Sequence, residues 1–335
     1  MNKIKITGSG LYVPGDAIDN AELKRLASID FDSDKMESKL GIKQRHIAHL
    51  RGIKETTADF ATKAAEKAIA DAGLKADDIN LIIVGTDTPE FITPATSILV
   101  QGRLQKEEKW TSTFDVSASC ASFTIAFDNA VRIMKTDSSI KYAVVIGVYN
   151  MPAFIRTDDA FSYPIFADGA GAIVLENLEE SKSDYINSQL LTDGTQWDFI
   201  GIYSGGAKNP ITKEKIDLND FGLMSLQPMP GDRNVRLWPM VIRKLLQKSK
   251  LELNEIDHFI FTQINKSVIL KVMDKLGLPY HKTTCIMDKY AYTGSACVPI
   301  AFHHALQDGK IKRGDKVMFV TSGAGLAVGS NVFTY

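Results

Sequence analysis

Cysteine is scarce in this sequence, which has Cys120, Cys285 and Cys297 among its 335 residues. Three is an odd number, and no two of these cysteines have the CxxC spacing of a metal-ligand pair, which argues against a disulfide framework and against a cysteine-based metal site. We therefore expect no metal. A cysteine with a special role would act as a free thiol.

Long apolar runs and an excess of charge of one sign are also missing. The longest apolar runs, residues 81–84 and 142–148, are far shorter than the roughly 20 residues that span a bilayer, and the first ten residues are too polar for a signal peptide. The net charge is −1, without the basic surplus that binding to a nucleic-acid backbone requires. We expect a cytoplasmic protein that binds neither membrane nor nucleic acid.

Apolar runs and helical periodicity alternate along the chain, a pattern typical of an α/β protein with mainly parallel strands. A first strand over 3–7 is followed by a glycine- and proline-rich turn over 8–15. Further strands are predicted at 79–85, 113–116, 142–148, 256–262, 283–288 and 316–321, and helices at 57–72, 121–134, 238–250 and 295–307.

The two halves of the chain share short matches at nearly the same offset. Asp-Ile-Asn at 78–80 matches Glu-Ile-Asp at 255–257, and Ile-Ala-Phe occurs at 125–127 and again at 300–302. Two matches about 175 residues apart indicate an internal duplication. We predict an N-terminal half over 1–176, a polar insertion or lid over 177–235 and a C-terminal half over 236–335.

Cys120 lies between a predicted strand and an apolar helix. The partial positive charge of a helix N-terminus favours thiolate over thiol, and free backbone N–H groups there can hold an oxyanion. The alternative is a buried cysteine of the core, which is our interpretation of Cys285 and Cys297. The glycine-rich residues 323–325 after the last strand are either a tight turn or a source of an N–H group that faces Cys120.

Several segments together resemble the β-ketoacyl-acyl-carrier-protein synthase III family of thiolase-fold condensing enzymes. The resemblance implies a duplicated, five-layered αβαβα thiolase-like fold and a homodimer. It also implies that Cys120 accepts the acyl group, with its own N–H and that of Ala324 as the oxyanion hole. The segments that carry it are residues 8–14, 40–46, 115–123, 166–172 and 314–330.

Two positions depart from the pattern of that family. Where the family has a histidine and an asparagine that drive malonyl decarboxylation, this sequence has Thr262 and Tyr292. A threonine hydroxyl cannot titrate near neutral pH, and a tyrosine phenol titrates near 10. The sequence therefore predicts a divergent member in which ordinary decarboxylative condensation is badly impaired.

The resemblance also suggests further binding residues. Arg233, Arg236 and Lys266 are candidates for contact with the phosphate of a pantetheine arm, or else are solvated surface charges. We expect the homodimer interface near Val144, Val145 and Ile146 and near the loop that carries Phe91. Candidate substrate-binding residues are Phe91, Phe161, Asn265, Gly323 and Gly325.

Three functions are compatible with these residues. The first is an acyltransferase that loads an acyl group from a coenzyme A or acyl-carrier-protein thioester onto Cys120 and passes it to an oxygen, nitrogen or sulfur nucleophile, in fatty-acid-like or secondary-metabolite biosynthesis. The second is a decarboxylating ketosynthase that uses a malonyl or β-ketoacyl thioester, and the third is a non-catalytic partner subunit. We favour the first, without a cofactor, although no general base is visible at the matched positions.

Overall fold

Two β-sheets form the framework of the molecule. The structure, a computed structural model, describes residues 2–228 and 230–335. The first sheet has the order β1-β7-β6-β4-β5 and the second β11-β12-β13-β8. The bounds are β1 (Lys3–Tyr12), β4 (Leu81–Gly85), β5 (Ser112–Val116), β6 (Tyr142–Tyr149), β7 (Gly169–Leu178), β8 (Asp184–Thr192), β11 (His258–Phe261), β12 (Lys316–Gly323) and β13 (Ala327–Thr334).

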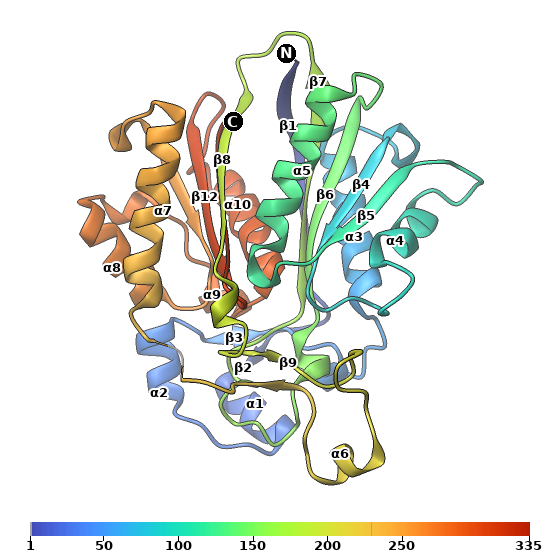
Figure 1. Cartoon of the computed structure of the whole chain (residues 1–335), viewed down its shortest axis with the longest axis vertical. Coiled ribbons are helices and arrows are strands. Elements are labelled where there is room, and N and C mark those ends of the chain that lie inside the picture. The colour runs from blue at the N-terminus through green and yellow to red at the C-terminus, as the bar shows by residue number, and fades with distance from the viewer. Residues whose placement is uncertain (1, 229) are drawn as a thin grey trace.

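Helices cover the sheets and separate them. Helix α3 packs on β1, β6 and β7 and on α4, whereas α5 and α10 lie between the two sheets and α7 packs on the far face of the second (Figure 1). The predicted five-layered α/β arrangement is confirmed. These helices are α3 (Thr57–Asp71), α4 (Thr96–Leu104), α5 (Ser122–Thr136), α7 (Arg233–Ser249), α8 (Lys266–Leu276) and α10 (Cys297–Gln307).

Aromatic rings fill the space between the sheets. Phe127 of α5 and Phe302 of α10 contact the rings of Phe319 on β12 and Phe333 on β13, with ring centroids 5.4 to 6.0 Å apart. Offset and edge-to-face contacts of this kind add to the stability gained from burial. The core between the sheets therefore fixes both central helices, including α5, which begins beside Cys120.

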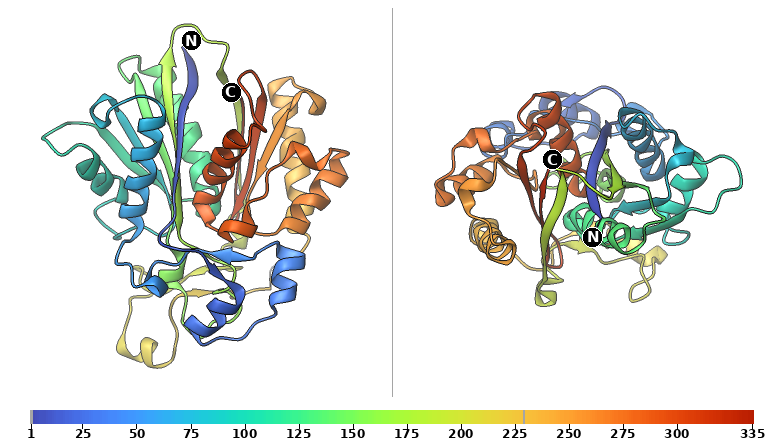
Figure 2. Two further views of the ribbon diagram at one scale, coloured as in Figure 1. Left: turned by 180° about the vertical axis from the view of Figure 1, so that it is seen from behind. Right: turned by 90° about the horizontal axis from the view of Figure 1, so that it is seen from above.

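Smaller elements close one end of the molecule, opposite the chain termini (Figures 1 and 2). Strand β8 lies inside the predicted insertion over 177–235, yet it pairs with β13 as an edge strand of the second sheet. The three-part division of the chain stays a prediction. The smaller elements are β2 (Ile18–Asp19), α1 (Asn20–Ala27), α2 (Ser33–Lys35), β3 (Gln44–Arg45), β9 (Gly201–Ile202), α6 (Lys213–Asp217), β10 (Leu223–Met224) and α9 (Met287–Tyr290).

Three sequence-based expectations about strands are wrong. Among the described strands of the two sheets, β4 pairs in parallel with β5 and β6, and β11 pairs in parallel with β12. The other neighbouring strands of these sheets are antiparallel. The first strand continues to Tyr12 instead of turning at Gly8. The segment 283–288 forms one bridge, between Thr283 and Phe259, before α9 begins.

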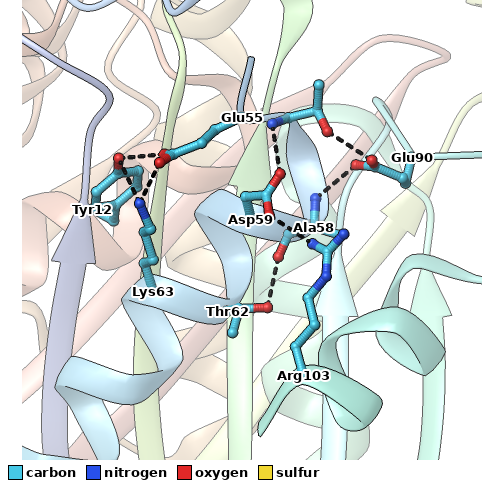
Figure 3. A network of polar contacts seen from close by, with 9 residues as sticks. Tyr12, Glu55, Ala58, Asp59, Thr62, Lys63, Glu90 and Arg103 are labelled. Carbon is cyan, nitrogen blue, oxygen red and sulfur yellow. Dashed lines mark hydrogen bonds and ion pairs between the residues drawn. The ribbon is translucent and has the colours of Figure 1, made fainter. Parts of the chain in front are cut away.

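A polar network fixes the segment that follows β4 (Figure 3). The Glu90 carboxylate accepts hydrogen bonds from Thr56 Oγ1 at 2.6 Å and from Ala58 N at 2.9 Å, at the start of α3. A carboxylate is favourable there because the helix N-terminus carries partial positive charge. The segment 86–90 is thereby tied to α3.

No helix of the described residues combines the length and the apolar character that crossing a membrane requires.

Candidate active site

A pocket of about 440 Å³ opens where the carboxyl ends of β4 and β5 face those of β11 and β12. In open α/β sheets, ligands bind at the carboxyl ends of parallel strands. Its polar part includes Asp87, Ser119, Cys120, Thr262, Tyr292 and Ser322, and its apolar part includes Met151, Phe166, Ile200, Ile202 and Leu223. Residues of β9 and β10 thus form part of its wall.

The turn between β5 and α5 places Cys120 at the pocket. The Ser122 hydroxyl accepts from Ala118 N at 2.9 Å and donates to Ser119 O at 2.6 Å, which closes the turn. Ser119 has a φ of 51°, in the left-handed region that non-glycine residues rarely adopt. Its hydroxyl donates to Asp87 Oδ2 at 2.8 Å, a contact that holds this conformation.

The end of β12 approaches the same turn closely. A Cβ atom at Gly323 would lie 2.6 Å from Ala118 O and 2.7 Å from Cys120 N, so a larger residue cannot occupy this position without displacing the turn. Ala324 follows and also lines the pocket. The two segments predicted to supply oxyanion N–H groups are therefore neighbours.

Thr262 and Tyr292 reach the pocket from the second half of the chain. Thr262 follows β11, and its hydroxyl accepts from Ser322 N at 3.2 Å. Tyr292 is held by a backbone hydrogen bond from its N–H to Ile165 O and by packing against the Phe166 ring. The Tyr292 phenol lies near enough to the Cys120 thiol to lower the pKa of that thiol.

Burial and charge keep Cys120 protonated. Burial raises the pKa of the thiol to about 12, and the negative charge of Asp87 adds to the rise, although Tyr292 and Ser119 favour the thiolate. The helix N-terminus does not offset this effect of burial on the thiol pKa, and the role of Cys120 as nucleophile stays a prediction. Burial also raises the pKa of Asp87, to about 6, against the hydrogen bond from Ser119. At neutral pH a carboxylate thus lies beside a protonated thiol.

Comparison with known proteins identifies the family. A family model described as 3-oxoacyl-[acyl-carrier-protein (ACP)] synthase III matches residues 114–194, and its C-terminal counterpart matches residues 246–335. A β-ketoacyl-[acyl-carrier-protein] synthase III of Wolbachia pipientis wMel is 34% identical over 336 residues, covering 100% of both chains. This chain belongs to the β-ketoacyl-[acyl-carrier-protein] synthase III family.

Other members of the family agree with this assignment. The β-ketoacyl-[acyl-carrier-protein] synthase III of Clostridium acetobutylicum is 31% identical and is matched over 99% of its length. The crystal structure of 3-oxoacyl-[acyl-carrier-protein] synthase III from Aquifex aeolicus superimposes with a TM-score of 0.86 at 30% identity, with 100% of each chain covered. The fold is thus the thiolase fold of β-ketoacyl-[acyl-carrier-protein] synthase III, a transferase of fatty-acid biosynthesis.

Six of the predicted site residues line the pocket of this synthase III family member, and their roles stay predictions. They are Cys120, Thr262, Tyr292, Gly323, Ala324 and Arg233. Arg233 is the first residue of α7, is half-buried, and has a buried Nε without a partner among the described atoms.

The other predicted binding residues lie outside this pocket. Asn265 caps α8 instead, where its side-chain oxygen accepts from Val268 N at 3.2 Å. Phe91 is exposed, and Phe161 lines a separate hollow of about 250 Å³. Exposed Arg236 pairs with Asp232 at 3.0 Å. Lys266 is exposed at the start of α8, and Gly325 lies in the turn after β12.

The predicted dimer residues Val144, Val145 and Ile146 also need correction. They lie on β6, an inner strand of the first sheet, and are completely buried. The sheet ends at β5 instead, which leaves that strand as a free edge within the described chain.

Asp87 and Ser119 are among the polar pocket residues that the sequence analysis missed. Their positions in the sequence could have identified them. Asp87 follows a predicted buried strand, just as Ser119 and Cys120 follow the strand that pairs with it in parallel. The carboxyl ends of parallel strands meet at one edge of a sheet, so the two segments had to be close.

Proposed function

We propose that this chain is an acyltransferase that takes an acyl group from a coenzyme A or acyl-carrier-protein thioester onto Cys120. It then transfers the group to an oxygen, nitrogen or sulfur nucleophile without decarboxylation. The main support for this proposal is that Thr262 and Tyr292 line the same pocket as Cys120. None of the described lining residues is a histidine.

The chemistry of these two side chains supports transfer over decarboxylation. The Thr262 oxygen already accepts the Ser322 N–H, which leaves the hydroxyl proton as a single neutral donor toward the pocket. Burial raises the pKa of Tyr292 well above 10, so this group stays a neutral donor at physiological pH. Stabilisation of an enolate by such donors is weaker than by a charged imidazolium, because charge-assisted hydrogen bonds are the strong ones.

The loading step needs less from these groups. A thiol adds to a thioester carbonyl through a tetrahedral oxyanion, for which backbone N–H groups are suitable donors. Each such donor is worth roughly 3 to 4 kcal/mol of barrier. Arg233 at the pocket is the nearest candidate contact for a pantetheine phosphate, through its charge. We further propose a homodimer that forms along the free edge of β5.

A decarboxylating ketosynthase is the second candidate. The relatives that match this chain over its full length favour it, because they are β-ketoacyl synthases at 31 to 34% identity. In that case other pocket groups would have to replace the histidine and the asparagine.

Acyl loading is tested with a panel of acyl thioesters and peptide mass spectrometry. We expect the acyl mass on the Cys120 peptide of the wild type, loss of that adduct in Cys120→Ala, and an unchanged adduct in Cys285→Ser. Cys285 is a suitable control because it is also a partly buried free thiol. A wild type without an adduct from any donor would contradict acyl loading and favour the partner-subunit function.

A further inference from the structure

Asp87 lies at the carboxyl end of β4, beside the turn that carries Cys120. The two segments are joined where Thr86 N donates to Val116 O at 3.0 Å, just beyond the paired ends of β4 and β5. Asp87 lines the same pocket as Cys120, and its Oδ1 is buried without a partner among the described atoms. An incompletely paired buried carboxylate is costly, so its presence at a pocket points to function.

Ser119 connects this carboxylate with the sulfur. Its hydroxyl donates to Asp87 Oδ2 at 2.8 Å and lies 3.9 Å from Cys120 Sγ. A serine hydroxyl has a single proton, so while that proton points to Asp87 the oxygen can only accept from the thiol. Thiol, hydroxyl and carboxylate therefore form a chain with one direction of donation.

We propose that Asp87 accepts the proton of the Cys120 thiol through Ser119 as the sulfur attacks an acyl thioester. This step rests on the proposed function and supplies the base that its loading reaction needs. The sulfur bonds to the carbonyl carbon while its proton moves to Ser119 Oγ and the Ser119 proton moves to Asp87 Oδ2. The C–S bond to the donor then breaks, and the departing thiolate regains a proton from Asp87 along the same chain.

The neighbouring charged groups leave Asp87 free to act in this way near neutral pH. Burial raises the pKa of Tyr149 and Tyr292 well above 10, so neither competes for the proton. Arg233 is the cation of the pocket, and burial lowers its pKa from 12.5. Cys120, with a pKa of about 12, is the donor, and Asp87, with a pKa of about 6, is the acceptor.

Asp87→Asn tests the proposed proton relay from Cys120 through Ser119 to Asp87. Asparagine keeps an oxygen that accepts a hydrogen bond from Ser119, but this oxygen cannot take up a proton. The readout is the rate of Cys120 alkylation by iodoacetamide, followed on the Cys120 peptide, which requires no acyl donor. We expect the wild type to react at least about tenfold faster than Asp87→Asn at pH 7.5, with a rate that falls as the pH drops through about 6. In the variant the rate should instead rise about tenfold per pH unit up to pH 9, because it follows thiol ionisation alone.

Two other roles of Asp87, repulsion of the thiolate and positioning of Ser119, predict different alkylation rates. If Asp87 only repels the thiolate, its removal lowers the thiol pKa and Asp87→Asn reacts faster, which overturns the proposal. If Asp87→Asn matches the wild type whereas Asp87→Ala is slow, the carboxylate only positions Ser119, which also overturns it. Ser119→Ala should show the loss seen in Asp87→Asn. The control Asp308→Asn removes an exposed partner of Lys310 and should leave the rates unchanged.

Acylation separates this proposal from the function on which it rests. Single-turnover acylation by an acyl thioester should follow the same order of rates as alkylation. If the wild type is alkylated with the expected pH dependence but forms no acyl adduct, the proposed function is wrong and the relay still holds.

Asp168 is a second buried carboxyl group, and burial raises its pKa to about 7. It is intact in Asp87→Asn, so a pH dependence that survives in that variant is not due to Asp87.

Discussion

Gly323 shows how tightly the residues around Cys120 are packed. Any Cβ there would overlap Ala118 O and Cys120 N at 2.6 and 2.7 Å, and both atoms belong to backbone that cannot move as a side chain can. This position therefore controls where the Cys120 N–H and sulfur lie. Catalytic geometry is sensitive to displacements of about 1 Å.

We expect Gly323→Ala to reduce Cys120 acylation by at least about 100-fold, measured as the rate of adduct formation. The matched control is Gly102→Ala on the exposed side of α4, where a Cβ meets no heavy atom within 4 Å. That variant should acylate normally and gain about 0.5 to 1 kcal/mol of stability, because alanine is the better helix former. Normal acylation by Gly323→Ala would mean that the β12 end does not hold the nucleophile.

At the residue scale, motifs located part of the site and geometry supplied the rest. Cys120, Thr262 and Tyr292 were found because each occupies a position of a recognised motif. Asp87 belongs to no such motif, and its proximity to Ser119 depends on the pairing of β4 with β5. Asn265 lies in the same short motif as Thr262 and was predicted to bind substrate. Its side-chain oxygen instead caps helix α8.

At the scale of elements, glycine was the main source of error. Gly8 and Gly10 indicated a turn, yet both lie within β1, where a Cβ would meet Ala68 O at 2.3 Å and Ala68 N at 2.5 Å. These glycines let α3 approach the strand closely. Sequence reading cannot separate this use of glycine from a turn, because the approaching helix is distant along the chain. The strongly apolar strands β4 and β6 were predicted well because burial on both faces gives continuous apolar runs.

Strand β11 carries a buried histidine that links stability to pH. Burial lowers the pKa of His258 to about 4, and its ring contacts Thr284 Oγ1 at 2.9 Å. The unfolded chain binds a proton near pH 6.5 whereas the folded chain does so only near 4, so stability is lost as the pH falls between these values. The slope is about 1.4 kcal/mol per pH unit.

We expect the wild type to lose about 2 kcal/mol more than His258→Gln between pH 7 and pH 5, measured by denaturant unfolding. The comparison between variants matters because Asp87 and Asp168, with raised pKa values, change stability in the opposite direction over the same range. Burial is the largest cause of the lowered His258 pKa, so His281→Gln, which removes a nearby exposed histidine, should keep most of the wild-type loss. Equal losses in wild type and His258→Gln would show that this ring is not buried in its neutral form.

For the molecule as a whole, the free edge of β5 is where we expect two copies to meet. Exposed apolar side chains gather on the segment between β4 and β5, and exposed apolar groups that lie together often mark interaction surfaces. They are Phe91, Ile92, Ile98 and Trp110.

We expect a dimer of about 74 kDa, twice the chain mass of 36.9 kDa, in size-exclusion chromatography with light scattering. Ile92→Asp combined with Trp110→Asp should shift it to the monomer, because the charges would be buried in the interface. The control Ile216→Asp, on exposed α6, should leave the dimer intact. A wild-type monomer at micromolar concentration would contradict the proposed homodimer.

The fate of the acyl group on Cys120 distinguishes acyl transfer without decarboxylation from decarboxylative condensation. Acyl-enzyme would be isolated by gel filtration and divided between a malonyl thioester and a set of simple alcohols, amines and thiols, with the Cys120 adduct and released carbon dioxide followed together. We expect that an acceptor nucleophile discharges the adduct, and that the malonyl thioester releases no carbon dioxide above the Cys120→Ala control. Discharge by the malonyl thioester with an equal amount of carbon dioxide would contradict this expectation and assign the chain as a decarboxylating ketosynthase.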